Sequence, residues 1–353
     1  MKRLGPVLLG GAATLVVLRL WVMPLFSSLW LDEFGTVWVT DAGLAGVVER
    51  LRLFPQSPAY AGLVAVGRTV LGSSEPALRL PSIVAMLAAV LLVGRLARSC
   101  FGRAAGAPAA GVFLLFPAIE FAAVDARPYA FAVLFATAAL LALRRLLESG
   151  RPGDAAAYVG AAAGSVYFHY LFAAGLPAHV VYALWRRRRG AGATDAVLAG
   201  TGVGLAALLT PAAIVTAGIA RGRAAHAFGA LPGALPLLNA LVPVRVLALL
   251  VPVVGIAFLL GARGLRPPVE PGESRGAAVL LGAAALSPPI VLFAASWILR
   301  TNLFEGRYLL AAAAPWAVLL GGVLAEIGPP GASRAVVAAA LALALVLRGE
   351  LLR

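Results

Sequence analysis

Two adjacent carboxylates, Asp32 and Glu33, stand directly after the first long apolar segment of the chain. Charged side chains are costly within a bilayer, so acidic residues in so apolar a chain mark either a membrane boundary or a functional site. In a water-filled cavity beside the membrane, Asp32 can take the proton of a sugar or lipid hydroxyl as a general base, while Glu33 holds a neighbouring group. The alternative is that the pair only marks where the lipid ends. Both interpretations place the carboxylates at a membrane surface.

Later polar segments carry further residues of complementary chemistry. Arginine binds phosphate through paired N–H groups and a carboxylate deprotonates a hydroxyl, so the two together suit a phosphate-activated sugar as substrate. Tyrosine adds a flat wall and a hydroxyl donor. The candidate catalytic residues are Asp32, Glu33 and Asp125, and the candidate substrate-binding residues are Arg79, Arg127, Tyr129, His169, Tyr170, Arg307 and Tyr308.

The composition shows that most of the chain lies in a membrane. Of its 353 residues, 61% are hydrophobic and 12% are charged, and the mean hydropathy is +0.95, which is typical of a polytopic membrane protein. The net charge of +14 does not indicate a nucleic-acid partner, because the arginines cluster between apolar segments, as in cytoplasmic loops facing anionic lipids. Cys100 is the single cysteine, so a disulfide and a cysteine metal site are both excluded. A divalent cation is compatible with the sequence but not implied by it.

The apolar segments predict an all-α membrane protein with about eleven spans, since each crossing needs about 20 apolar residues. Lys2 and Arg3 precede the first segment, which we interpret as an uncleaved span rather than a signal peptide. Two short crossings are expected between residues 154 and 185, with a turn near His169 and Tyr170. The predicted spans are about 6–29, 80–97, 104–119, 129–147, these two, 196–217, 238–260, 277–299, 309–327 and 335–347.

The first external loop, about residues 30–79, is expected to contain two helices that lie in the membrane interface. Residues 41–54 place apolar side chains at helical spacing opposite charged ones. Pro58–Leu71 is short and carries an arginine, Arg68. If this second segment crossed the membrane, the basic turn after the next span would lie outside, against the positive-inside trend.

Basic turns then leave all ten candidate residues on one, non-cytoplasmic face. The chain reads as a single polytopic domain, residues 1–353, without a soluble carboxy-terminal domain, and its Ala, Leu, Gly and Arg bias is typical of a GC-rich bacterial genome. A bacterial plasma membrane is therefore the expected location. The second hypothesis is a transporter or flippase for a lipid-linked glycan, and the third is a non-catalytic assembly subunit. No internal repeat is visible and the polar residues gather at one face, which favours surface chemistry over transport.

Several candidate residues also have purely structural interpretations. Arg79 is placed to cap a helix at the interface, and a histidine in a tight turn, such as His169, is often a hydrogen-bonded structural residue. The loop with Arg221, Arg223 and His226 suits contacts with solvent or lipid phosphates. The tryptophans of the amino-terminal region fit an aromatic belt better than a sugar platform: Trp21, Trp30 and Trp38.

Five motifs in this order resemble the GT-C membrane glycosyltransferases, in the branch of the protein O-mannosyltransferases and the lipid A aminoarabinose transferases. The resemblance extends from about residue 24 to residue 320. Its motifs are Asp32-Glu33, Glu75-Pro-Ala-Leu-Arg-Leu-Pro-Ser82, Arg98-Ser-Cys-Phe-Gly102, Asp125-Ala-Arg-Pro-Tyr-Ala130 and Arg307-Tyr-Leu-Leu310.

The resemblance implies a fold of about eleven spans, a polyprenyl-phosphate-linked sugar as donor, and inverting transfer on the non-cytoplasmic face to a lipid, glycan or protein hydroxyl. It implies that Asp32 is the catalytic base, with Glu33 and Asp125 matching further acidic residues. The family usually has a His or Lys beside the proline matched by Pro58, where this chain has Gln56 and Ser57. The candidates for the contact with the donor phosphate are therefore Arg127, Arg79 and Arg307.

Overall fold

The structure is a computed structural model, and every element of the part of the chain that it describes is a helix. The description covers residues 4–54, 56–190, 192–222, 229–259, 271–327 and 331–349. Arg223 and His226 lie outside these ranges, so the expectation for their loop concerns residues that the structure does not describe.

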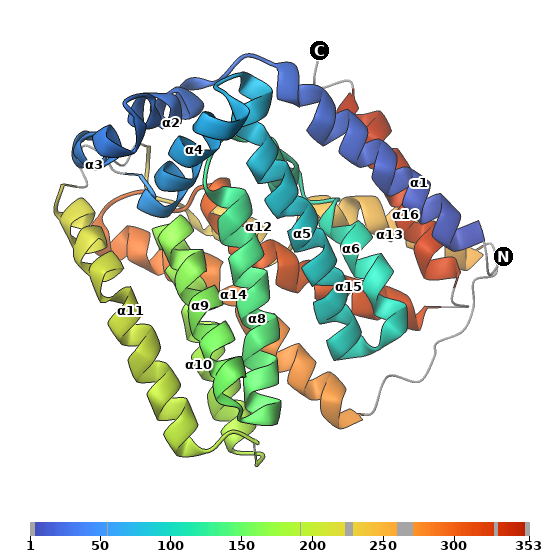
Figure 1. Cartoon of the computed structure of the whole chain (residues 1–353). Helices are drawn as coiled ribbons and strands as arrows, with labels where there is room; N and C mark the ends of the chain where they lie inside the picture. Colours follow the sequence, from blue (N-terminus) through green and yellow to red (C-terminus); the bar gives the residue numbers. More distant parts are fainter. Residues whose placement is uncertain are drawn as a thin grey trace.

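Each predicted span corresponds to one helix or to two or three consecutive helices (Figure 1). The first span is α1 (Leu4–Val16), which continues through η1 (Val17–Val22) and η2 (Met23–Phe26). The others follow in the order α5 (Glu75–Phe101), η3 (Arg103–Ala105) with α6 (Gly106–Phe113) and α7 (Pro117–Ala123), α8 (Tyr129–Ser149), α9 (Pro152–Phe168), α10 (Leu176–Arg187), α11 (Asp195–Arg221), α12 (Ala234–Leu241) with α13 (Val244–Leu259), α14 (Pro271–Leu299), η6 (Gly306–Ala312) with α15 (Ala313–Glu326), and α16 (Ala332–Gly349).

Six of these helical segments are long and apolar enough to cross a membrane, or up to eight if each of two bent pairs is one span. The bends are 75° between the η3–α6 helix and α7, and 47° between α12 and α13. Helices α9 and α10, with 17 and 12 residues, are short for a full crossing. The structure thus confirms an all-helical, multi-pass membrane protein, and the count of eleven stays a prediction.

Small residues allow the helices of the core to pack closely. A Cβ atom added to Gly321 of α15 would lie only 2.4 Å from the Cα of Ala109 on α6. Such small–small contacts replace the hydrophobic driving force that is missing between helices in lipid. Trp21 is fully buried in this core. The expectation that Trp21 belongs to an aromatic belt was therefore wrong, because the π-helical turn of η1 directs it inward.

Three short helices cover one end of the long helices: α2 (Leu31–Asp41), α3 (Gly43–Leu53) and α4 (Pro58–Leu71) (Figure 1). The two helices expected in this loop are confirmed, and the bounds of α4 are those predicted. Helix α2 had no counterpart in the prediction. It begins one residue before Asp32, and Glu33 caps it by accepting a hydrogen bond from the backbone N–H of Trp30, at 3.1 Å.

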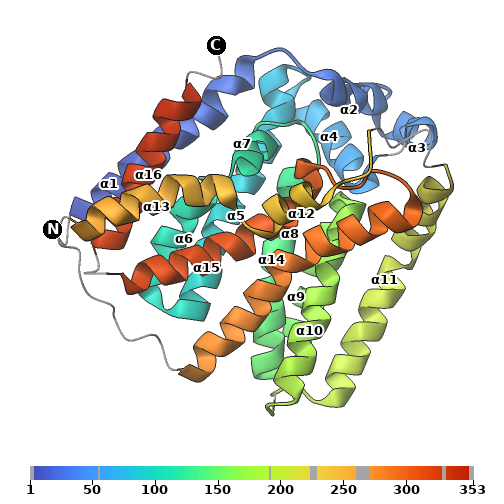
Figure 2. The ribbon, with the colours of Figure 1, turned by 180° about the vertical axis from the view of Figure 1, so that it is seen from behind.

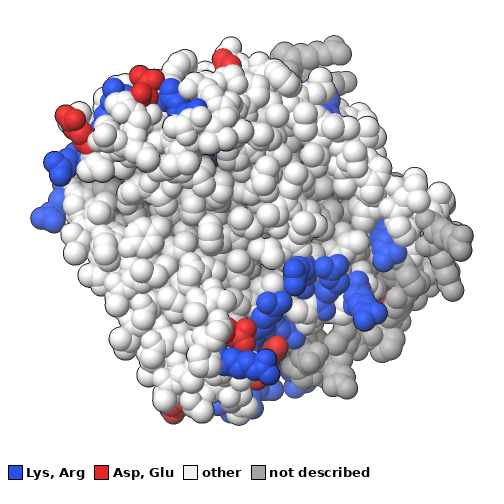
Figure 3. All heavy atoms as spheres, viewed as in Figure 1, with Lys and Arg blue, Asp and Glu red and all other residues white. Residues whose placement is uncertain are grey.

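Arginine side chains gather at the opposite end of the long helices. Figure 3 shows most of the basic residues of this face in its lower half, with a second, smaller group of mixed sign near α2 and α3 and an uncharged surface between them. The last turns of α5 and α10 contribute Arg98, Arg186 and Arg187 to this end. A band without charge between two charged ends is the surface expected of a membrane-spanning bundle.

Candidate active site

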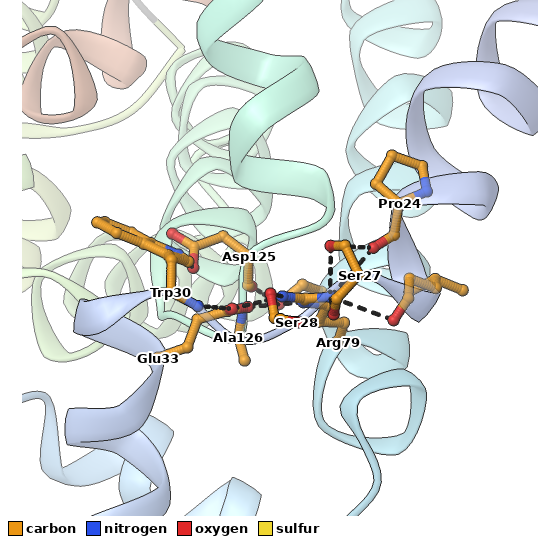
Figure 4. Close-up of polar contacts among 10 residues, drawn as sticks. Pro24, Ser27, Ser28, Trp30, Glu33, Arg79, Asp125 and Ala126 are labelled. Atoms are coloured by element: carbon orange, nitrogen blue, oxygen red, sulfur yellow. Dashed lines mark hydrogen bonds and ion pairs between the residues drawn. The ribbon is translucent and has the colours of Figure 1, made fainter. Parts of the chain in front are cut away.

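A buried network joins the end of the first span to α2 and α5 (Figure 4). Arg79, on α5, donates from Nε and Nη2 to the carboxylate of Glu33, at 2.8 and 2.6 Å. Its Nη groups also donate to the backbone oxygens of Pro24, Ser27 and Ser28, at 3.0, 2.7 and 3.0 Å. Arg79 therefore caps the carbonyl groups at the end of the first span, among which that of Pro24 also accepts from Ser27.

Glu33 is saturated in the same network. Its side chain is fully buried and also accepts a hydrogen bond from the backbone N–H of Ala126, at 2.8 Å. The structure thus gives Glu33 and Arg79 internal partners, and neither of them lines the nearby cavity. The capping interpretation of Arg79 fits this geometry, and the roles of Glu33 in catalysis and of Arg79 in substrate binding stay predictions.

Asp125 lies in the loop between α7 and α8 and is 2% exposed. Its Oδ1 accepts a hydrogen bond from Nε1 of Trp30, at 3.0 Å, and its backbone oxygen accepts one from Ser82, at 2.7 Å. No described residue bonds its Oδ2. Trp30 therefore orients this carboxyl group rather than serving only as part of an aromatic belt. Burial raises the pKa of Asp125 to about 7, although the hydrogen bond from Trp30 opposes the shift.

This raised pKa predicts a pH dependence of stability. The unfolded carboxyl group loses its proton near pH 4, whereas the folded one keeps it up to about pH 7, so its contribution to stability is present below about pH 4 and is lost as the pH rises through 7. Asp125→Asn keeps the acceptor for Trp30 but does not titrate. We expect its thermal midpoint to fall less than that of the wild type between about pH 5 and pH 8.

Thermal unfolding of both proteins in detergent, at a series of pH values, measures this difference. Asp154→Asn, at a partly exposed position that bonds Ser149 on the opposite end of the bundle, is the matched control and should follow the wild-type curve. Parallel curves for wild type and Asp125→Asn would show that Asp125 is charged throughout this range.

Asp32 forms an ion pair with Arg307, which comes from η6. The side chain of Asp32 is 27% exposed and that of Arg307 is 33% exposed. This pair is therefore partly accessible to solvent, unlike the buried pair of Glu33 and Arg79. Arg127 donates from Nη1 to the backbone oxygen of Asp32, at 3.1 Å. Three segments that are far apart in the sequence therefore meet at Asp32: the start of α2, the loop before α8, and η6.

Helix α7 is held in place by the last turn of α16. Arg348 pairs with Glu120 of α7, at 3.0 Å, and donates to the backbone oxygen of Leu115, at 2.7 Å, in the break before α7. Phe121 of the same helix packs edge-on against Trp30, with ring centroids 5.4 Å apart. These contacts fix the helix that leads into the loop of Asp125 and Arg127.

A cavity of about 260 Å³ opens beside this junction. The ring of His169 lies between those of Tyr129 and Tyr308, with centroids 5.1 and 5.3 Å away. Burial, helped by the charges of Arg127 and Arg307, lowers the pKa of His169 to about 3, so the ring is neutral at neutral pH. Of the predicted substrate-binding residues, those that line the cavity are Arg127, Tyr129, His169, Tyr170 and Tyr308.

Neutral polar residues also line the cavity, and the sequence reasoning did not choose them as site residues. They are Gln56, Ser57, Thr216, Thr301 and Asn302. The amide nitrogen of Gln56 and Nε of Arg127 are buried, and no described residue accepts a hydrogen bond from either. Buried donors without partners are rare in proteins, so such donors at a cavity indicate a place for an acceptor-rich ligand. Gln56 and Ser57 stand beside Pro58, where the resemblance leads one to expect a His or Lys, and this departure from the family pattern could have pointed to them.

Within the described ranges, no three His, Cys, Asp or Glu side chains are grouped so that they could hold a metal ion. Among the described residues that line the cavity, the charged one is Arg127, and the ion pair of Arg307 with Asp32 lies beside it. The arrangement can thus neutralise a phosphate with guanidinium groups and offer one exposed carboxylate beside it.

Comparisons with known proteins agree with this description. Residues 55–215 match the model of a family described as dolichyl-phosphate-mannose-protein mannosyltransferase. No curated protein matches the chain significantly. The structure of ArnT from Cupriavidus metallidurans bound to undecaprenyl phosphate matches 89% of this chain with a TM-score of 0.57 and 14% sequence identity, and its apo structure matches 90% with 0.55 and 16%.

The chain spans 59% of the length of these ArnT chains. At such low identity, the structural match concerns the fold. Both comparisons agree with the resemblance that the motifs predict. Residues 55–215 match the mannosyltransferase family model, and about nine-tenths of the chain shares the fold of ArnT.

Proposed function

We propose that this protein is an inverting glycosyltransferase that moves a sugar from a polyprenyl-phosphate donor to a hydroxyl group of a lipid, glycan or protein. One observation carries the proposal: the exposed Asp32–Arg307 pair adjoins a cavity with a further arginine, Arg127, and an aromatic wall. The donor class is supported by the matching ArnT structure, which was solved with undecaprenyl phosphate.

The donor phosphate is held by Arg127 and Arg307. Arg127 reaches the backbone of Asp32 with one Nη group and has an unpartnered Nε, so its guanidinium group is fixed beside the cavity with donor capacity left. Arg307 lies over the ring of Tyr308, 5.3 Å from its centroid, and can share its charge between Asp32 and a phosphate. Both arginines stabilise the negative charge that grows on the phosphate as the sugar departs.

The sugar is held against the aromatic wall of Tyr129, His169 and Tyr308. Asp32 accepts the proton of the acceptor hydroxyl while the hydroxyl oxygen bonds to the anomeric carbon. The bond between that carbon and the phosphate oxygen breaks on the opposite side, and the electron pair leaves with the lipid phosphate. One displacement inverts the configuration at the anomeric carbon, and the proton remains on Asp32.

We also propose that the protein lies in a bacterial plasma membrane, which its chain crosses about eleven times. The active site would then face the non-cytoplasmic side. The support is the separation of the site, at the end covered by α2, α3 and α4, from the arginine-rich opposite end (Figure 3). Basic ends face the cytoplasm in membrane proteins, which leaves Asp32 on the other side.

Purified protein in lipid nanodiscs, incubated with a panel of radiolabelled polyprenyl-phosphate sugars and extracted lipid acceptors, tests this function. We expect label to move covalently to an acceptor and free polyprenyl phosphate to accumulate. Label that crosses the membrane of a proteoliposome while still attached to its donor would instead support the flippase hypothesis.

Replacing Arg127 by Lys should lower kcat/KM about 10-fold or more, because a guanidinium fork becomes a single point charge and a charge-assisted hydrogen bond is lost. The transfer assay above measures this. Arg52→Lys, at an exposed position of α3, makes the same change outside the cavity and should retain wild-type turnover. Full activity of Arg127→Lys would leave Arg307 as the phosphate-binding residue.

A further inference from the structure

A second hollow, which we call the α12–α13 groove, borders the same segment η6. It measures about 400 Å³ and lies among α7, α12, α13, η6 and α15, on the face shown in Figure 2. Gly306 and Leu309 of η6 line this groove, whereas Tyr308 lines the cavity. The two hollows share no lining residue, so the groove is a separate site with η6 as a common wall.

The lining of the α12–α13 groove is apolar apart from a few hydrogen-bond donors. Arg245 and Asn239 are exposed there, on either side of the break between α12 and α13. The indole N–H of Trp316 is buried at the wall, and no described residue accepts from it. Among the described residues, no acidic side chain lines the groove. An occupant therefore meets a long apolar wall and one uncompensated positive charge.

The groove opens toward the surface that a bilayer covers. Helices α12 and α13 are together long and apolar enough to form a bent membrane span. On α13, the side chains of Val244 and Val251 are 49% and 62% exposed. An arginine on such a surface is costly unless it reaches water or pairs with an anion, and basic pockets between membrane helices bind anionic head groups. The apolar wall and the positive charge of Arg245 thus favour a molecule with an apolar chain and an anionic head group.

We propose that the α12–α13 groove binds a membrane lipid with an anionic phosphate head group. The phosphate pairs with Arg245, and an acyl chain lies along the apolar wall formed by α12, α13 and α15. This binding does not depend on the proposed transfer reaction. A lipid in the groove contacts the backbone of η6 next to Arg307, the residue that pairs with Asp32.

The experiment uses the full-length protein in detergent with phosphatidylglycerol as the probe and zwitterionic phosphatidylcholine of the same chains as its comparison. Bound lipid is counted by native mass spectrometry over a range of lipid concentrations. We expect phosphatidylglycerol to bind about 10-fold more tightly than phosphatidylcholine, since a full charge pair is worth a factor of this order. Arg245→Gln should remove this preference.

Two further variants distinguish lipid binding in the α12–α13 groove from non-specific lipid binding elsewhere on the protein. Ala240→Phe fills the groove from α12, a helix with no buried residue, and should abolish the tight site without disturbing the core. Arg52→Gln removes an exposed charge on α3, a helix that contributes no residue to the groove, and should change nothing. An unchanged preference in Arg245→Gln, tight binding in Ala240→Phe, or equal affinity for soluble glycerol phosphate would overturn the proposal.

Discussion

Asp32→Asn should bind the donor normally and transfer its sugar at least about 100-fold more slowly. A sugar hydroxyl is a weak nucleophile, and a positioned carboxylate that removes its proton contributes about 10²–10⁴-fold in rate. Asparagine keeps the shape and much of the hydrogen bonding of Asp32 but has no basic carboxylate oxygen. The loss should therefore appear in kcat rather than in donor affinity.

Single-turnover transfer measures the rate, and equilibrium binding of the donor lipid measures the affinity. Asp41→Asn is the matched control, because Asp41 ends the same helix α2, is 63% exposed and, among the described residues, pairs only with Arg68, whose side chain is 14% exposed. Normal transfer by Asp32→Asn with an inactive Asp125→Asn would move the base to Asp125. Full activity of both variants would remove the basis for an enzyme and favour the transporter hypothesis.

The arrangement of helices was largely predictable, because hydropathy records which segments avoid water. Every predicted span has a helical counterpart, and the bounds of Pro58–Leu71 were predicted to the residue because Ser57, Pro58 and Gly72 are strong helix-boundary signals. The break at Phe116 and Pro117 was missed, since the sequence stays apolar through it. Helix α2 was missed because its first turn carries two acids, which indicated a polar loop.

The candidate site was predictable in its residues but not in their roles. Asp32, Glu33 and Asp125 were candidates because they are acidic residues in an apolar chain. The sequence could not show that Asp32 is partly exposed while Glu33 and Asp125 are buried. That difference is set by partners distant in the chain. Arg307 pairs with Asp32 across 275 positions, while Arg79 pairs with Glu33 across 46.

Neutral cavity residues were harder still to predict. Gln56, Thr301 and Asn302 carry no charge and occur in segments that read as ordinary loops. Their placement depends on how α4 and the segment before η6 fold back to the same cavity. Polar residues of this kind become candidates only when burial shows that their hydrogen-bonding groups lack partners.

Arg79→Met should destabilise the protein by about 3–5 kcal/mol, the cost of leaving one member of a buried ion pair unpaired. The carboxylate of Glu33 would stay fully buried and lose two hydrogen bonds, and the backbone oxygens of Pro24, Ser27 and Ser28 would lose their caps. Arg187→Met is the control, because Arg187 and Asp195 form a pair with side chains 60% and 69% exposed. Such a pair is worth about 0–1 kcal/mol.

The double variant Glu33→Gln/Arg79→Met keeps this prediction testable where Arg79→Met alone yields no folded protein. It removes the buried charge together with its partner, so we expect it to be more stable than Arg79→Met alone. Denaturant unfolding of the wild type, both single variants and the double variant gives the coupling energy. A coupling energy near zero would show that Glu33 and Arg79 act independently, and the buried pair would then not hold the first span against α2 and α5.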